Sequence, residues 1–235
     1  MKKRSVIPKL LRKFGGSQLH KSLWRIDERE LKNIMSSLQN HRFIILRRER
    51  KLKASTINDK NELVDLGSLV ILAFDLSEDQ EAGRKAVERL LHRSPHLYLC
   101  RSVYAFPQPR GIYGKTPLRR ISEIVNELGG KITILPRMAI VNTPVIDGLI
   151  QEAKARLEGQ LSSMIKLFQQ KNYKELRFDV YDLKELEKLK VKVFRFKTIV
   201  SLYAKWLNLD STHFMKEIQK MLKNLERIRK ERFVK

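Results

Sequence analysis

The sequence predicts an α+β fold, and three observations lead to this prediction. Residues 69–74 form a continuous apolar, β-prone run of the length typical of a buried strand. From there to residue 141, strand and helix patterns follow one another in the order β-α-β-β-α-β. Beyond residue 143, apolar residues recur at helical spacing over three long stretches. We therefore expect a ferredoxin-like core over 67–143, a basic N-terminal region over 1–66 and a C-terminal helical bundle over 144–235.

The N-terminal region begins with a basic stretch that ends at Gly15-Gly16, and we expect a mobile arm with one helical turn there. Asp27 followed by Glu30 is a capping-box pattern, so residues 28–39 are predicted to form a helix. Residues 43–46 are predicted to be a short strand. The polar residues 54–66 are predicted to be a loop.

The core is predicted element by element. The strand over 69–74 precedes a helix over 79–92, which Ser94-Pro95 terminates. Residues 97–106 are either a strand pair or one bent strand. Thr116-Pro117 is an N-cap followed by a first-turn proline, and Gly129-Gly130 closes the helix between them. The last strand covers 131–135, with a continuation to 141 left open.

Three helices are predicted to follow, over 145–171, over 183–207 and from residue 210 onward. Each is apolar on one side and basic on the other. Each must therefore bury its apolar stripe against its neighbours, against the core or against a second chain.

The charge of the chain indicates its class of partner. Lys and Arg number 49 against 26 Asp and Glu, a formal net charge of +23. The excess lies on the two flanks, +10 over residues 1–66 and +9 over 144–235, whereas 67–143 carries only +4. Such an excess favours binding to a polyanion, and nucleic acid is the first candidate.

Composition also excludes several classes. The single Cys100 excludes an internal disulfide framework and a cysteine-rich zinc site. The longest apolar run is too short to span a bilayer, and no secretory signal pattern follows the basic N-terminus. We therefore expect a cytoplasmic protein with no membrane partner and no cofactor.

Three basic runs are the predicted nucleic-acid contacts, because Arg and Lys side chains bind phosphate and each run contains at most one acid. The predicted contact residues are Lys2, Lys3, Arg4, Arg12, Lys13, Arg42, Arg47, Arg48, Arg50, Lys51, Lys53, Arg227, Arg229, Lys230 and Arg232. A single charge run is usually a solvated face, but solubility alone does not require three.

The middle segment resembles a known family. Residues 72–79 (Leu-Ala-Phe-Asp-Leu-Ser-Glu-Asp), Arg84 and residues 101–106 (Arg-Ser-Val-Tyr-Ala-Phe) are similar to the small endonuclease-like subunit of CRISPR spacer acquisition. The same core resembles the middle domain of phenylacetate-pathway repressors and of chromate-resistance regulators. The resemblance covers about 75 residues, and it implies a symmetric homodimer.

The resemblance also implies a role for Asp75. In such a dimer, Asp75 of each chain would share a divalent metal such as Mg²⁺ and act as the catalytic residue of a nuclease. The alternative is that Asp75 caps the following helix or sits in the turn. Two other patterns are rejected as sites: residues 110–116 lack the first glycine of a phosphate-binding loop, and His92 and His96 are separated by a helix break.

The sequence thus predicts a non-enzymatic, homodimeric protein that binds structured RNA, with a ribosome or another ribonucleoprotein as its host. A dimer with basic material at both ends would bridge two targets, as a ribosome-dimerising hibernation factor does. Two alternatives stay open. One is a Mg²⁺-dependent endonuclease that uses Asp75, and the other is a DNA-binding transcription regulator with a winged helix within residues 17–53.

Overall fold

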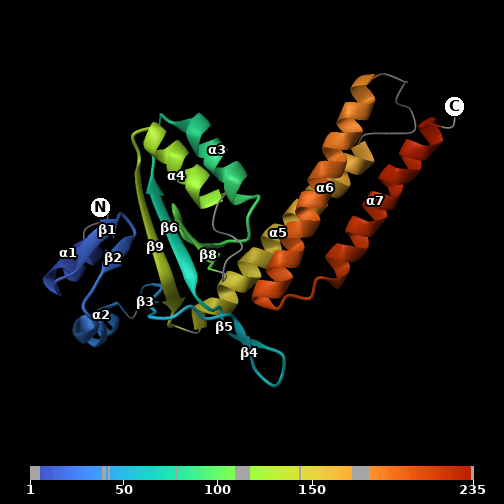
Figure 1. Ribbon diagram of the computed structural model, residues 1–235. Helices are drawn as coiled ribbons and strands as arrows, with labels where there is room; N and C mark the ends of the chain where they lie inside the picture. The colour runs from blue at the N-terminus through green and yellow to red at the C-terminus, as the bar shows by residue number, and fades with distance from the viewer. Residues whose placement is uncertain are drawn as a thin grey trace.

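The computed structural model describes residues 6–38, 41, 43–77, 79–108, 117–142, 144–170 and 180–233. Its centre is a five-stranded antiparallel sheet with the order β3-β9-β6-β8-β7 (Figure 1). The strands are β3 (Leu46–Arg48), β6 (Leu69–Asp75), β7 (Leu97–Cys100), β8 (Val103–Pro107) and β9 (Lys131–Ile140). Helices and an antiparallel sheet in one chain confirm the α+β class.

The two faces of the sheet bury different sets of side chains, because successive residues of a strand point to opposite sides. On β6, Leu72 and Phe74 pack against helices α3 (Glu81–Leu91) and α4 (Pro117–Glu127). Leu69, Ile71 and Ala73 face the other way and join a larger cluster with the C-terminal helices. The sheet therefore lies between a helix pair and a helical bundle.

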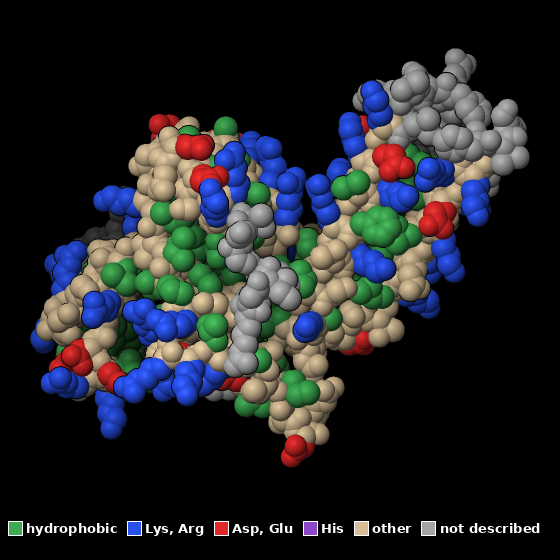
Figure 2. Space-filling model, viewed as in Figure 1, with side chains coloured by type: hydrophobic (Ala, Val, Ile, Leu, Met, Phe, Trp, Pro, Cys, Tyr) green, Lys and Arg blue, Asp and Glu red, His purple; other side chains and the backbone are tan. Residues whose placement is uncertain are grey.

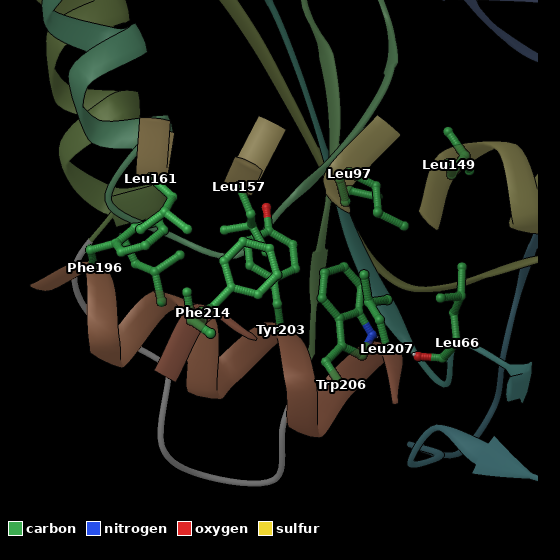
Figure 3. Close-up of a cluster of buried hydrophobic side chains, with 14 of the residues drawn as sticks. Leu66, Leu97, Leu149, Leu157, Leu161, Phe196, Tyr203, Trp206, Leu207 and Phe214 are labelled. Atoms are coloured by element: carbon green, nitrogen blue, oxygen red, sulfur yellow. Dashed lines mark hydrogen bonds between the residues drawn. The ribbon is translucent and has the colours of Figure 1, made fainter. Parts of the chain in front are cut away.

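The bundle consists of α5 (Pro144–Gln170), α6 (Val180–Leu207) and α7 (Thr212–Phe233), and its outer part projects away from the sheet (Figure 1). The three helices pack through one apolar stripe each, as their periodicity predicts. The last turns of α6 reach the sheet. There the Trp206 indole lies beside Leu66 and donates a hydrogen bond from Nε1 to the Leu66 carbonyl oxygen, 3.0 Å away (Figure 3).

A buried polar cluster joins the bundle to the sheet, and we call it the sheet–bundle joint: His96, Arg156 and Tyr203. The Tyr203 hydroxyl donates to the His96 carbonyl oxygen at 2.6 Å and accepts from the His96 backbone N–H at 2.8 Å. His96 Nδ1 lies 3.0 Å from the Ser94 carbonyl oxygen, and Nε2 lies 2.6 Å from Arg156 Nη1. The imidazole must donate to the carbonyl and accept from the guanidinium, so the fold holds it in the neutral form.

The N-terminal residues form a packed module rather than a mobile arm. The module contains α1 (Val6–Lys13), a hairpin of β1 (Ser17–His20) and β2 (Leu23–Arg25), a 3-10 turn η1 (Glu28–Glu30) and α2 (Leu31–Ser37). Leu11 of α1 is buried with Ile34 and Leu38. The expectation of an arm with one turn is therefore wrong for residues 6–13, because the apolar side of α1 has a partner in α2.

Two further local predictions differ from the structure. The strand predicted over 43–46 lies at Leu46–Arg48, because the Asn142 side chain binds the backbone of Phe43 and Ile45 and pairing with β9 begins only at Leu46. The loop predicted over 54–66 contains a small hairpin, β4 (Thr56–Ile57) with β5 (Leu63–Asp65). Residues 97–106 form a strand pair, since a tight turn with Ser102 at a φ of 62° separates β7 from β8.

Candidate nucleic-acid interface

One basic surface of the molecule is the segment over residues 47–53, which we call the β3 basic segment. It starts on β3, an edge strand whose only partner in the described sheet is β9. The side chains of Arg47, Arg48, Arg50 and Lys51 are exposed. Two of these four predicted contacts, Arg47 and Arg48, thus lie on β3, and the other two lie in the bend that follows it.

The one acid of this segment points inward. Glu49 is 8% exposed, and its carboxylate accepts a 2.9 Å hydrogen bond from the Ser68 hydroxyl and pairs with Lys53 Nζ at 2.7 Å. Burial alone would raise the pKa of Glu49, but the hydrogen bonds from Lys53 and Ser68 outweigh it and hold the pKa below its usual value. We call this contact the Glu49 anchor. Its consequence is that the outer surface of the segment presents cations while the negative charge is held inside.

Ser68 and Gly67 fix the backbone under the segment. The Ser68 hydroxyl accepts a hydrogen bond from the Lys53 N–H at 2.9 Å, and the Ser68 N–H donates to the Lys53 carbonyl oxygen at 3.0 Å. Gly67 has a φ of +71°, and a Cβ on it would lie 2.6 Å from the Ala54 carbonyl carbon. Only glycine permits both that φ and that approach.

Arg137 belongs to the same surface, although the sequence analysis did not select it. It lies in a bulge of β9 with a φ of 60°, and its carbonyl oxygen accepts a hydrogen bond from the Glu49 N–H at 2.7 Å. Its guanidinium reaches the Arg50 carbonyl oxygen at 3.4 Å. The sequence does contain a signal for this bulge: Pro136 directly precedes Arg137, and a proline within a strand indicates a bulge or an edge.

The N-terminal module adds further cations on the same side of the molecule. Figure 1 places α1, α2 and β3 together, and Figure 2 shows Lys and Arg side chains gathered over this region. Lys13 is exposed at the end of α1, and the Arg12 guanidinium lies 5.8 Å from the centre of the Trp24 ring. Trp24 is thus packed within the module and covered by a cation, so it is no open platform for a base.

The C-terminal basic run lies elsewhere. Arg227, Arg229 and Lys230 are exposed near the end of α7, which Figure 1 shows far from β3, at the outer end of the bundle. The structure therefore divides the predicted contact residues between two ends of the molecule. Lys2, Lys3, Arg4, Arg42 and the side chain of Arg232 lie outside the described residues.

Asp75 ends β6 and is engaged by the N-terminal hairpin. Its carboxylate pairs with Lys21 Nζ at 2.8 Å, and His20 Nε2 lies 3.1 Å from the neighbouring Phe74 carbonyl oxygen. The hydrogen bond from Lys21 lowers the pKa of Asp75 despite partial burial. Among the residues that the structure describes, no group of three or more His, Cys, Asp or Glu side chains is placed to hold a metal ion. Catalysis and metal binding by Asp75 remain predictions.

Comparison with protein-family models, with curated proteins and with solved structures found no match to this chain. In the described part of the chain, no helix is both long and apolar enough to cross a membrane.

Proposed function

We propose that this protein binds structured RNA, as a component of a cytoplasmic ribonucleoprotein such as a ribosome, through the β3 basic segment and the N-terminal module. One observation carries the proposal. The only acid within the β3 basic segment is turned into the protein, whereas Arg47, Arg48, Arg50 and Lys51 are exposed, so the exposed charges of the segment are all positive. Arginine binds phosphate through two parallel hydrogen bonds, and the edge strand β3 and the bend after it bring three arginines within four positions of the chain.

The secondary structure of the described part of residues 17–53 favours RNA over a DNA operator as the target. Within the described part of residues 17–53, a β-hairpin precedes one short helix, α2. A winged-helix regulator would need a recognition helix that enters the major groove. A charged strand edge instead suits recognition by backbone and shape, which is typical of structured RNA.

We also propose that the core is ferredoxin-like and forms a homodimer that bridges two RNA targets. The order β9-β6-β8-β7, with α3 and α4 over the same face of the sheet, supports the ferredoxin-like plan. Basic surfaces at two ends of each chain support bridging. We propose no enzymatic activity, and the pairing of the Asp75 carboxylate with the Lys21 ammonium at 2.8 Å supports this.

Binding to a duplex RNA, measured by fluorescence anisotropy at several salt concentrations, tests the proposal. In the triple variant Arg47→Gln, Arg48→Gln and Arg50→Gln, affinity at low salt should fall at least tenfold. The slope of log affinity against log salt should become shallower by about 2 to 3, since each lost phosphate contact removes about 0.7 to 0.9.

The matched control removes three exposed charges from α3 and the turn that follows it: Lys85→Gln, Arg89→Gln and Arg93→Gln. If both triple variants lose the same affinity for RNA, the loss reflects net charge alone, and this result would contradict the proposed binding surface. Incubation of the wild type with RNA and Mg²⁺ tests the nuclease alternative. Cleavage that disappears in Asp75→Ala would overturn the non-enzymatic proposal.

A further inference from the structure

The outer face of α6 carries a second cationic surface, made of residues that belong to none of the three basic runs. An open groove along this face is lined by four cations, one acid and one valine: Lys184, Lys188, Lys192, Arg195, Glu187 and Val191. The cations outnumber the acid, and their side chains are exposed. Figure 2 shows an exposed hydrophobic patch with basic side chains around it on the bundle.

The spacing of these cations follows the helix. Lys184, Lys188 and Lys192 are four residues apart, so successive ammonium groups lie about 6 Å apart along the axis. From Lys184 to Arg195 the row extends over about 16 Å. A regular row of single charges matches a ligand that repeats its own charge along a line, as a phosphate backbone does. Lys188 also pairs with Glu185 at 2.9 Å, so the charge of one member of the row is partly balanced within the helix.

An exposed aromatic side chain, Phe194, follows the groove residue Val191 by three positions, so it lies next to Val191 at the edge of the groove. Phe194 is 46% exposed and Val191 is 43% exposed, whereas Val193 and Phe196 on the opposite face of α6 are buried in the bundle. A phenylalanine that takes no part in the core and lies at the edge of a cationic groove provides a flat surface for a nucleic-acid base.

We propose that this face of α6 binds a single-stranded segment of RNA, with the cationic row along the phosphates and Phe194 stacked on a base. This inference rests on the proposed function and extends it to a second site with a different form of the ligand. Charge complementarity selects a polyanion here. A second copy of the chain would place these cations against their own equivalents, and like charges repel.

The experiment uses the full chain and two RNA probes of similar length, a 12-nucleotide oligouridine and a mixed-sequence duplex. Phe194→Ala should weaken binding of oligouridine by about tenfold, as expected for the loss of one stacked base. Phe194→Trp should restore it. The double variant Lys184→Gln, Lys192→Gln should weaken oligouridine binding by a similar factor. Neither α6 variant should change duplex binding more than twofold.

The matched control is Lys216→Gln, Lys223→Gln, which removes the same charge from exposed positions on α7. The inference is overturned if Phe194→Ala leaves oligouridine binding unchanged, or if the α7 control loses as much affinity as the α6 double variant. It is also overturned if only phosphatidylserine vesicles show Phe194-dependent binding, since the face would then be a lipid contact. Loss of duplex binding in the β3 triple variant tests the proposed function separately. The proposed function and the inference about α6 can therefore fail independently.

Discussion

The β3 basic segment and the basic end of α7 have similar sequences, yet the structure holds their charges differently. Each run contains several cations and a single acid. In the β3 basic segment the acid, Glu49, is buried under the surface and bonded to Ser68 and Lys53. Among the described residues of α7, no acidic side chain is buried, and the cations lie along an exposed helix face.

The difference teaches that a charge run alone does not define a binding surface. In the first region, buried contacts fix the backbone and sort the charges, with cations outside and the anion inside. In the second, the cations lie on the exposed side of a helix, with no buried acid among the described residues beneath them. Preorganised cations lose less conformational freedom when they bind phosphate, so we expect the β3 basic segment to contribute more affinity per charge.

The largest effect on stability is expected from acid. The sheet–bundle joint connects the sheet, which carries the β3 basic segment, to the bundle, which carries α7, and this joint depends on a neutral His96. Burial, and then the nearby Arg156 and His92 charges, lower the pKa of His96 from 6.5 to about 4. Between these two values the unfolded chain binds a proton that the folded chain excludes. Stability is therefore complete above pH 6.5 and is lost as the pH falls toward 4, by roughly 3 kcal/mol in all.

Urea unfolding at a series of pH values measures this loss. In His96→Gln, which does not titrate, the free energy of unfolding should vary much less between pH 6.5 and 4. The control His213→Gln removes an exposed histidine of α7 and should keep the slope of the wild type. A slope that persists unchanged in His96→Gln would assign the acid sensitivity to another group.

The backbone under the β3 basic segment supplies the next prediction. Gly67→Ala should lower the free energy of unfolding by about 2 kcal/mol, because alanine is disfavoured at positive φ and its Cβ would overlap the backbone of Ala54 and Ser55. Gly129→Ala is the matched control, since Gly129 has a φ of +66° but no atom within 4 Å of the added Cβ. The difference between the two variants reports the close approach alone. Equal losses would mean that the approach relaxes freely.

The sequence predicted the elements whose signals come from neighbouring residues, and it missed those that depend on contacts between distant residues. Helical periodicity placed α5, α6 and α7 within a few residues, and the apolar run placed β6, because both patterns come from burial of one face. The β3 register was missed because a side chain 97 residues away, Asn142, takes the Ile45 N–H. The packing of α1 was missed for a similar reason, since the apolar partners of Leu11 lie on α2.

For the candidate site, the sequence predicted which basic residues take part but not how their side chains are arranged. The sequence selected Arg47, Arg48, Arg50 and Lys51, and all four side chains are exposed. Lys53 was selected with them as a contact, but its ammonium pairs with Glu49. No local pattern shows that Glu49 points inward, because its partner Ser68 lies 19 residues further along the chain.

The smallest expected effect on stability gives the sharpest test of the comparison. Glu49→Gln keeps the shape of the side chain but removes the charge that Ser68 and Lys53 bind, so the free energy of unfolding should fall by about 1 kcal/mol. The pKa of Glu49 is lowered in the fold, so the contribution of its charge exists above the unfolded value of 4.5 and is lost as the pH falls. The stability deficit of the variant should therefore shrink below pH 4.5.

The same variant separates charge from organisation in binding. Glu49→Gln makes the β3 basic segment more positive by one charge, so net charge alone predicts tighter binding to duplex RNA. If the Glu49 anchor arranges the segment, affinity should instead fall by about two- to fivefold, because the cations must then be ordered on binding. On α7 the acid Glu226 is exposed rather than buried, so Glu226→Gln should change stability less than Glu49→Gln does and tighten RNA binding slightly. Tighter binding in both variants would show that the two regions act through charge alone.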